Sequence, residues 1–173
     1  MVALPKRRPS GRRATAAPYR IRPARAADVA DVVAIERATF SDPWSANDFE
    51  ECIASGVPFL VAEQRGAVLG YAIAHWGADE AEILNVGVAP AYRRQGVGRA
   101  LVERMLAALH DHGARVVYLE VRESNVIARR LYESLGFTEV ARRACYYRRP
   151  VEDAVILRAA IPAGQTGQAS AKL

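Results

Sequence analysis

The sequence predicts a single α/β domain with a mixed sheet of seven strands and about four helices. The chain has 173 residues, of which 51% are hydrophobic and 25% charged, a composition typical of a globular domain with one core. Short apolar runs typical of strands alternate with stretches of helical periodicity. In the middle, the apolar run 83–89 leads into a basic turn with two glycines and then into a helical pattern. We expect this strand, turn and helix to organise the domain.

The first half of the chain predicts two helices among three strands. Strands are expected at 19–23, 59–64 and 68–75, and helices from Asp28 to Phe40 and from Ser45 to about Ser55. Asp28 is a candidate cap of the first helix, and Ser45 with Asp48 forms a capping-box pattern for the second. Residues 65–67, Arg-Gly-Ala, predict a hairpin loop between the second and third strands.

The first helix carries a carboxylate in its apolar stripe. Its expected inward face consists of Val29, Val32, Val33 and Phe40. Glu36 falls within that stripe, where a charged side chain is unexpected. Two interpretations stay open: a partly exposed glutamate at the helix edge, or a carboxylate that lines a substrate cleft.

The second half of the chain predicts two more helices among four strands. Strands are expected at 82–89, 116–121, 138–148 and 153–161, the last two as an antiparallel pair. The helix after the glycine turn ends near Gly113, and the next is capped by Ser124 or Asn125 and ends at Gly136. Their inward residues are expected to be Val102, Met105, Leu106 and Leu109 in the first and Ile127, Leu131 and Leu135 in the second.

The net charge of +5 resides in the first 18 residues. The basic side chains there, with no acid among them, are Lys6, Arg7, Arg8, Arg12 and Arg13. Without them, 19 basic residues balance 19 acidic ones, so the body of the chain is neutral. We expect residues 1–18 to be a basic disordered tail that contacts RNA on a ribosome, is a solvated extension or reflects a misassigned start. Residues 162–173 are expected to be a flexible tail.

Composition argues against several classes of protein. No apolar run approaches the roughly 20 residues that span a bilayer, and the N-terminus lacks the apolar core of a signal peptide. We therefore expect a cytoplasmic protein without membrane contact. Cys52 and Cys145 are too few for a disulfide scaffold or a zinc site and are interpreted as reduced thiols. With His75 far from His110 and His112, neither a metal cluster nor a catalytic triad is predicted.

The glycine turn is an expected binding site for phosphate. Backbone N–H groups of the turn and the first helical residues converge there, the helix dipole adds positive potential, and Arg93, Arg94 and Arg99 raise it further. A Walker-type loop is excluded because Gly98 is followed by Arg-Ala rather than Lys-Ser/Thr. A dinucleotide-binding fold is disfavoured because Leu101 stands where a third glycine is needed and the strand lies in mid-chain.

Several motifs together resemble the GCN5-related N-acetyltransferase family. Residues 93–98, Arg-Arg-Gln-Gly-Val-Gly, match its pyrophosphate loop Arg/Gln-x-x-Gly-x-Gly/Ala, and Asn125, Tyr132 and 135–137 follow in the family's order. The resemblance covers about 19–161, which would form one acetyltransferase domain. It implies a mostly antiparallel seven-stranded sheet that is splayed in the middle, with acetyl-CoA as the donor co-substrate and no metal.

Further segments resemble the branch of that family that acetylates the N-terminal alanine of ribosomal small-subunit protein eighteen. They are 42–45, 85–88, 119–122, 124–125, 131–137, 146–147 and 152–154. Two departures lie where the substrate cleft should close: Cys145, and the short connection from Tyr147 to Glu152. The resemblance implies the N-terminus of a ribosomal protein as the substrate.

By this resemblance the cofactor contacts two stretches of backbone. Its pantetheine arm would lie along Val86, Gly87 and Val88 of a splayed strand, where a backbone N–H can polarise the thioester oxygen. Gly87 would permit close approach of the ligand, or mark a bulge. The pyrophosphate would be held by the loop of Arg93, Arg94, Gln95, Gly96, Val97, Gly98 and Arg99. Asn125 would contact the cofactor arm or cap its helix.

Two residues match the family's proton-transfer groups. Glu120 would be the general base; its alternative role is a carboxylate paired with Arg122 or another arginine. Tyr132 would be the general acid that protonates the departing thiolate, although its surroundings alone would make it a packing residue. The candidates for binding the substrate terminus are Glu36, Trp44, Tyr146 and Tyr147.

Three functions are compatible with these motifs. The resemblance favours direct transfer of acetyl from acetyl-CoA to a protein N-terminus in a ternary complex, with both cysteines as bystanders. An acetyltransferase for a small amine or a protein lysine would use the same two catalytic groups. A non-catalytic acyl-CoA sensor or ribosome-docking module is disfavoured because Glu120 and Tyr132 are both present.

Overall fold

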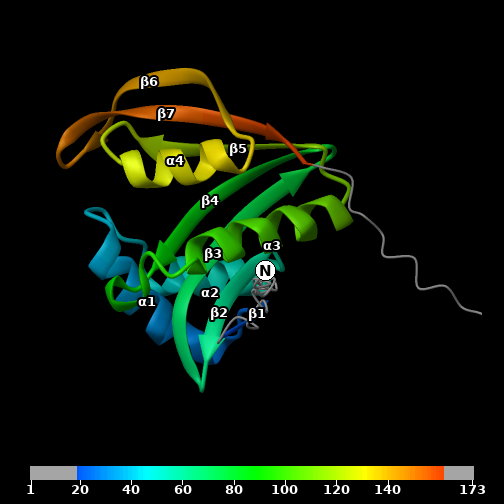
Figure 1. The fold of residues 1–173 in the computed structure, drawn as a ribbon. Coiled ribbons are helices and arrows are strands. Elements are labelled where there is room, and N and C mark those ends of the chain that lie inside the picture. The colour runs from blue at the N-terminus through cyan, green and yellow to red at the C-terminus, as the bar shows by residue number, and fades with distance from the viewer. Residues whose placement is uncertain (1–18, 162–173) are drawn as a thin grey trace, which may run out of the picture.

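A computed structural model describes residues 19–161, so the predictions for 1–18 and 162–173 lie outside the described residues. The strands are β1 (Arg20–Pro23), β2 (Phe59–Gln64), β3 (Ala67–Gly77), β4 (Glu80–Val88), β5 (Val116–Arg122), β6 (Thr138–Arg148) and β7 (Val151–Ala160). The helices are α1 (Val29–Thr39), α2 (Ala46–Ser55), α3 (Val97–Asp111) and α4 (Val126–Ser134), with 3₁₀ turns η1 (Ala26–Asp28) and η2 (Pro90–Tyr92). The predicted α/β fold with a seven-stranded, mostly antiparallel sheet is confirmed (Figure 1).

The sheet has the strand order β1-β2-β3-β4-β5-β7-β6. Only the central β4–β5 pair is parallel, and α3 forms its crossover. Turn chemistry fixes the hairpins on either side. Arg65 and Gly66 both have positive φ, as a two-residue turn between twisted antiparallel strands requires. Arg149 and Pro150 form the equally short turn between β6 and β7.

Helices cover the sheet on both faces. On one face α3 and α4 pack on β2 to β5 and β7 through a large apolar cluster that includes Leu101, Met105 and Leu119. On the other face α1 and α2 pack on β2 and β3 through a smaller cluster around Phe49 and Tyr71. Both clusters consist of residues at the helical or alternating spacing that the sequence shows, so burial of these faces holds the layers together.

The two helix starts that were predicted in the first half differ in how they are capped. Ser45 and Asp48 form the expected capping box, because each side chain accepts a bond from the other's backbone N–H. The prediction that the Asp28 side chain caps α1 is wrong. Asp28 occupies the cap position, but its carboxylate accepts two bonds from Arg22, at 2.7 and 2.8 Å, and one from the backbone N–H of Arg25.

The prediction that Ile127 faces inward is also wrong. Its side chain is 70% exposed. The buried stripe of α4 runs instead through Ala128, Tyr132 and Leu135, at i, i+4 and i+7. Because successive helical residues are rotated by about 100°, Ile127 then points away from the sheet.

The sheet splays between β4 and β5. The two strands pair only from Glu80 to Ile83, and Leu84 is an extra residue that interrupts the pairing of β4 with β3. Such a bulge bends a strand and increases its twist. Beyond it β5 continues to pair with β7 as far as Arg122, whereas residues 84–88 of β4 have one edge without a partner strand. Figure 1 shows β4 and β5 diverging at this point.

Candidate active site

A cleft of about 830 Å³ lies at the splay. Its walls come from the loop between α1 and α2, the open part of β4, the end of β5, the start of α4 and the β6–β7 turn. The predicted site residues that line it are Glu36, Trp44, Val86, Glu120, Asn125, Tyr132, Tyr146 and Tyr147. The fold therefore brings both predicted proton-transfer residues and the four predicted substrate residues to one cavity.

Glu120 lies where β5 leaves β4. Its carboxylate pairs with Arg143 of β6, with Oε1 and Nη1 separated by 2.7 Å, and its side chain is 17% exposed. A hydrogen bond to this carboxylate raises the pKa of Tyr146. The two interpretations of Glu120 are thus compatible, because the carboxylate is paired with an arginine and also lines the cleft.

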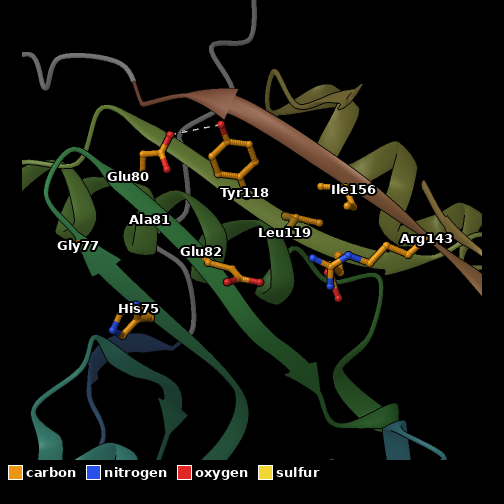
Figure 2. A pocket seen from close by; sticks show the side chains of 10 residues that line it. His75, Gly77, Glu80, Ala81, Glu82, Tyr118, Leu119, Arg143 and Ile156 are labelled. Atoms are coloured by element: carbon orange, nitrogen blue, oxygen red, sulfur yellow. Dashed lines mark hydrogen bonds and ion pairs between the residues drawn. The ribbon is translucent and has the colours of Figure 1, made fainter. Parts of the chain in front are cut away.

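A second cavity of about 390 Å³ adjoins the cleft on the open face of β4 and β5 (Figure 2). Glu82, Leu119 and Glu120 line both cavities. In Figure 2, Glu80 bonds Tyr118 at one end of the smaller cavity and Arg143 reaches in at the other. Glu120 therefore lies at the junction between the two cavities.

Tyr132 projects from the second turn of α4 into the core beside the cleft. It is 8% exposed, and its ring packs on Phe137 with centroids 5.6 Å apart. Burial, with a smaller contribution from Tyr147, raises the pKa of its hydroxyl to about 12. The hydroxyl consequently stays protonated at neutral pH, as a proton donor must.

The paired tyrosines of β6 form one wall of the cleft. Their rings meet edge to face at 5.2 Å. Tyr146 is 45% exposed, whereas Tyr147 is half-buried, and burial together with the charge of Glu120 raises the pKa of Tyr147 to about 12. Cys145 precedes them with a positive φ, and its backbone N–H bonds Asp153 where β6 bulges away from β7. Cys145, which departs from the family pattern, thus lies at the β-bulge that orients Tyr146 and Tyr147.

Glu36 is buried at the floor of the cleft, with 1% of the residue exposed. It accepts hydrogen bonds from the hydroxyl of Tyr71, the backbone N–H of Trp44 at 3.0 Å and the side chain of Asn85 at 3.1 Å. The expectation of a partly exposed glutamate at a helix edge is wrong. Three donors satisfy the buried carboxyl group, and the bonds join α1, β3, β4 and the loop at Trp44.

Gly87 is required by a neighbour within the sheet. A Cβ on this residue would lie 2.5 Å from Cε1 of Tyr71, its partner on β3. The bulge considered for Gly87 lies instead at Leu84. The absence of a side chain at Gly87 thus makes room for the ring that bonds Glu36.

The glycine loop leads directly into the N-terminus of α3. Gly96 has φ of 83° and caps the helix without a side-chain hydrogen bond, so the first N–H groups point outward. Arg94 also has positive φ and is exposed. Gly98 fits against Val88, where an added Cβ would make ordinary contacts. Open donors at a 15-residue helix with nearby cations suit an anion.

Some predicted cofactor residues make contacts of their own in this loop. Arg93 bonds the carbonyl of Val88 and the hydroxyl of Thr39. Gln95 bonds the backbone carbonyl of Ala91 in η2, and Arg99 bonds Ser134 of α4 at 2.5 Å. Asn125 accepts the N–H of Ala128 and is therefore the cap of α4, one of its two expected roles.

Sequence reasoning missed three residues of this site. Tyr71 and Asn85 satisfy Glu36, and Arg143 pairs with Glu120. A carboxylate in an apolar stripe signals that partners exist, but it does not identify them.

Within residues 19–161 no group of three or more His, Cys, Asp or Glu could hold a metal ion, and none of the helices there has the length and hydropathy to cross a membrane.

The fold, the splay and the glycine turn at the start of α3 agree with one family of acetyltransferases. The acetyltransferase (GNAT) family model matches residues 29–137, and the chain belongs to this family. The chain is an acyltransferase, as its fold and its named relatives agree. It is 39% identical over 125 residues to the ribosomal protein bS18-alanine N-acetyltransferase of Escherichia coli. The aligned region covers 71% of this chain and 84% of the relative.

Two solved structures of related proteins share the fold. The crystal structure of the ribosomal-protein-S18-alanine N-acetyltransferase from Escherichia coli matches with a TM-score of 0.77 and 36% identity, covering 86% of this chain and 97% of that one. The structure of yncA from Salmonella typhimurium with its cofactor acetyl-CoA matches with a TM-score of 0.72 and 25% identity, covering 88% and 99%. The family resemblance inferred from the sequence is confirmed.

Proposed function

We propose that this protein transfers the acetyl group of acetyl-CoA to the N-terminal alanine of ribosomal small-subunit protein eighteen. The observation that carries the proposal is that Glu120 and Tyr132 line one cleft, beside the edge of β4 that lacks a partner strand. The relatives named for this activity support the choice of substrate. We expect the reaction to take place in the cytoplasm, where such a substrate is made.

The residues present fit acetyl-CoA. The edge of β4 at 84–88 has no partner strand and would offer its backbone to an extended pantetheine arm, except at the Val88 carbonyl, which Arg93 bonds. The uncapped start of α3, with Gly96 and the exposed Arg94, suits a pyrophosphate. Bound there, acetyl-CoA would supply a thioester carbonyl at the splay, and a backbone N–H of β4 would polarise its oxygen.

Glu120 and Tyr132 divide the proton transfers. A free α-amine has a pKa of roughly 7.7–8.0, against about 10.4 for lysine, so little deprotonation must be driven for an N-terminal acceptor. Glu120 would accept that proton, directly or through a water molecule, at the junction with the smaller cavity. Tyr132, with its pKa raised to about 12, would donate a proton to the leaving thiolate.

We propose direct transfer in a ternary complex. Neither Cys52 nor Cys145 lines the cleft, so neither is placed to carry the acetyl group. Five acidic residues and three arginines line the cleft, and this excess of acid favours a cationic acceptor; the acidic residues are Glu36, Asp42, Glu82, Glu120 and Glu152. Trp44, Tyr146 and Tyr147 would flank its backbone. Separately, we propose that the basic side chains of residues 1–18 contact ribosomal RNA.

Mass spectrometry of three acceptors incubated with acetyl-CoA tests the proposal. The acceptors are a peptide with a free N-terminal alanine, the same peptide with that amine blocked, and a polyamine. We expect one acetyl group on the free peptide alone. Acetylation of the blocked peptide or the polyamine would establish the lysine or small-amine function instead. Binding of acetyl-CoA without any transfer would identify a non-catalytic sensor.

A further inference from the structure

Arg122 links three walls of the cleft: the end of β5, the loop between α1 and α2, and the β6–β7 turn. It lies two residues beyond Glu120 on β5, and its side chain is 23% exposed. Its guanidinium pairs with Glu152 of β7 at 3.2 Å and donates to the hydroxyl of Ser41 at 2.9 Å. Ser41 belongs to the loop between α1 and α2, so one side chain spans the cleft from one wall to the other.

The same guanidinium also holds the β6–β7 turn. It donates to the backbone carbonyls of Arg149 at 3.3 Å and Pro150 at 3.4 Å, which form that turn. Its plane lies over the ring of Tyr147, 4.0 Å from the centroid. A planar group with several fixed donors can satisfy these partners together, whereas a lysine ammonium cannot.

Glu152 extends this network to α4. Its second carboxylate oxygen accepts the backbone N–H of Ser124, just before the helix that carries Tyr132. These bonds lower the pKa of Glu152, so its charge persists at neutral pH. The loop at Ser41, the turn at Pro150 and the start of α4 are therefore fixed to one another through Arg122.

We propose that Arg122 is a positioning residue that sets the width of the acceptor half of the cleft. The inference rests on the proposed function and names the residue that shapes its substrate site. Arg122 acts through Tyr147 and the loop at Ser41, which would flank the acceptor. Its hydrogen bonds go to Ser41, Arg149, Pro150 and Glu152, and none of these residues lies in the glycine loop at 93–99, where the cofactor phosphates would bind.

Arg122→Lys tests this inference because it keeps the charge but loses the planar fork. We expect the Kd of a fluorescent alanine-initiated peptide, titrated into CoA-saturated enzyme, to rise about tenfold. The Kd for CoA should stay unchanged, and KM for the peptide should rise more than kcat falls. Arg158→Lys is the matched control, since Arg158 is an exposed arginine on the neighbouring strand β7 and does not line the cleft.

Ser41→Ala removes only the bond to the loop and guards against misfolding of the lysine variant. Its Kd for the peptide should rise by a smaller factor, and the two changes should be non-additive in the double variant because they break the same link. An unchanged peptide Kd in Arg122→Lys, a matching loss of CoA affinity, or a wild-type protein that does not bind the peptide would each overturn the inference. Peptide binding without acetyl transfer would instead count against the proposed function alone.

Discussion

In the proposed mechanism a single hydroxyl, that of Tyr132, would protonate the leaving thiolate, and its surroundings are apolar. Tyr132 is buried against Phe137, and burial raises its pKa from 10.0 to about 12. A weaker acid transfers its proton less readily, but it is fully protonated over a wider pH range. Because the pKa of a cysteine thiol is about 8.5, transfer of the proton to a thiolate is opposed by this shift, which in return keeps the hydroxyl protonated up to high pH.

Replacement of Tyr132 by phenylalanine should lower kcat by about 10²-fold or more, because the proton donor is lost while the ring still packs. Binding of acetyl-CoA should be unaffected. Tyr118→Phe is the control, since that hydroxyl bonds Glu80 away from the cleft. Equal rates for the two variants, measured as CoA release, would exclude Tyr132 as the acid.

The pH profile follows from the same raised pKa. The acid is active when protonated, so a folded pKa of about 12 extends the active range upward from 10.0. We expect kcat/KM to rise as the acceptor amine loses its proton, with a midpoint of roughly 7.7–8.0, and then to stay level to about pH 10. A decline centred near pH 10 that disappears in Tyr132→Phe would contradict this assignment.

Glu120→Gln should reduce kcat/KM at neutral pH by about 10²-fold and less at high pH, where the amine is already neutral. Glu80→Gln serves as the control because it removes a carboxylate from the far end of the smaller cavity. Initial rates at two pH values suffice for the comparison. A loss of the same size at both would show that Glu120 has a role other than accepting this proton.

At the scale of elements, the splay depends on how β3 and β4 fit together. Tyr71 lies over Gly87 and bonds Glu36, which in turn holds Asn85 of β4. The ring of Tyr71 thus occupies the space that a side chain on β4 would need. The bulge at Leu84 then turns the open edge of β4 toward the cleft.

Gly87→Ala should destabilise the fold by about 1–3 kcal/mol, because the new methyl group would collide with a buried ring. Gly77→Ala is the control, since a Cβ there meets nothing within 4 Å. Denaturant unfolding of both variants gives the two free energies. Equal stability would mean that Tyr71 can move aside without cost.

Alanine substitution of the two glycines in the loop should have different effects on stability. Gly96 has φ of 83°, so Gly96→Ala should cost about 1–2 kcal/mol of unfolding free energy. Gly98 lies within α3, where an added Cβ would be 3.5 Å from Val88, so Gly98→Ala should be neutral or stabilising. The reverse order in thermal unfolding would show that the loop is not held in this conformation.

At the scale of the whole molecule, we expect the ion pairs between β1 and Glu63 of β2 to contribute to the loss of stability in acid. Bonds from the backbone of Gly66 and from Arg20 and Arg22 lower the pKa of Glu63 from 4.5 to about 2. A lowered folded pKa stabilises the protein fully above the unfolded value and loses its effect as the pH falls toward the folded one. This contribution is therefore lost between about pH 4.5 and about pH 2.

Glu63→Gln should lower the Tm at neutral pH and make it fall less steeply between about pH 5 and about pH 2. The replaced side chain no longer changes charge, so its share of the acid sensitivity disappears. Glu50→Gln, on the exposed face of α2, should leave the slope unchanged. An unaltered slope in Glu63→Gln would mean that other carboxylates govern acid unfolding.

Local signals in the sequence predicted the order and type of the elements because each carries its own periodicity and caps. The splay followed only from the family resemblance. The partner of Glu120 was not predictable, since Arg122, its neighbour on β5, pairs elsewhere and Arg143 arrives from β6. The position of Arg143 beside Glu120 depends on the strand order β5-β7-β6, which no local sequence pattern predicts. The tight fit of Gly87 under Tyr71 is likewise a property of strand register.

We propose that donor and acceptor meet in one cleft and react directly. Initial rates measured over a matrix of acetyl-CoA and alanine-peptide concentrations test it most directly. Direct transfer in a ternary complex predicts double-reciprocal lines that intersect. Parallel lines, together with an acetyl group trapped on Cys52 or Cys145, would show a covalent intermediate and contradict the proposal.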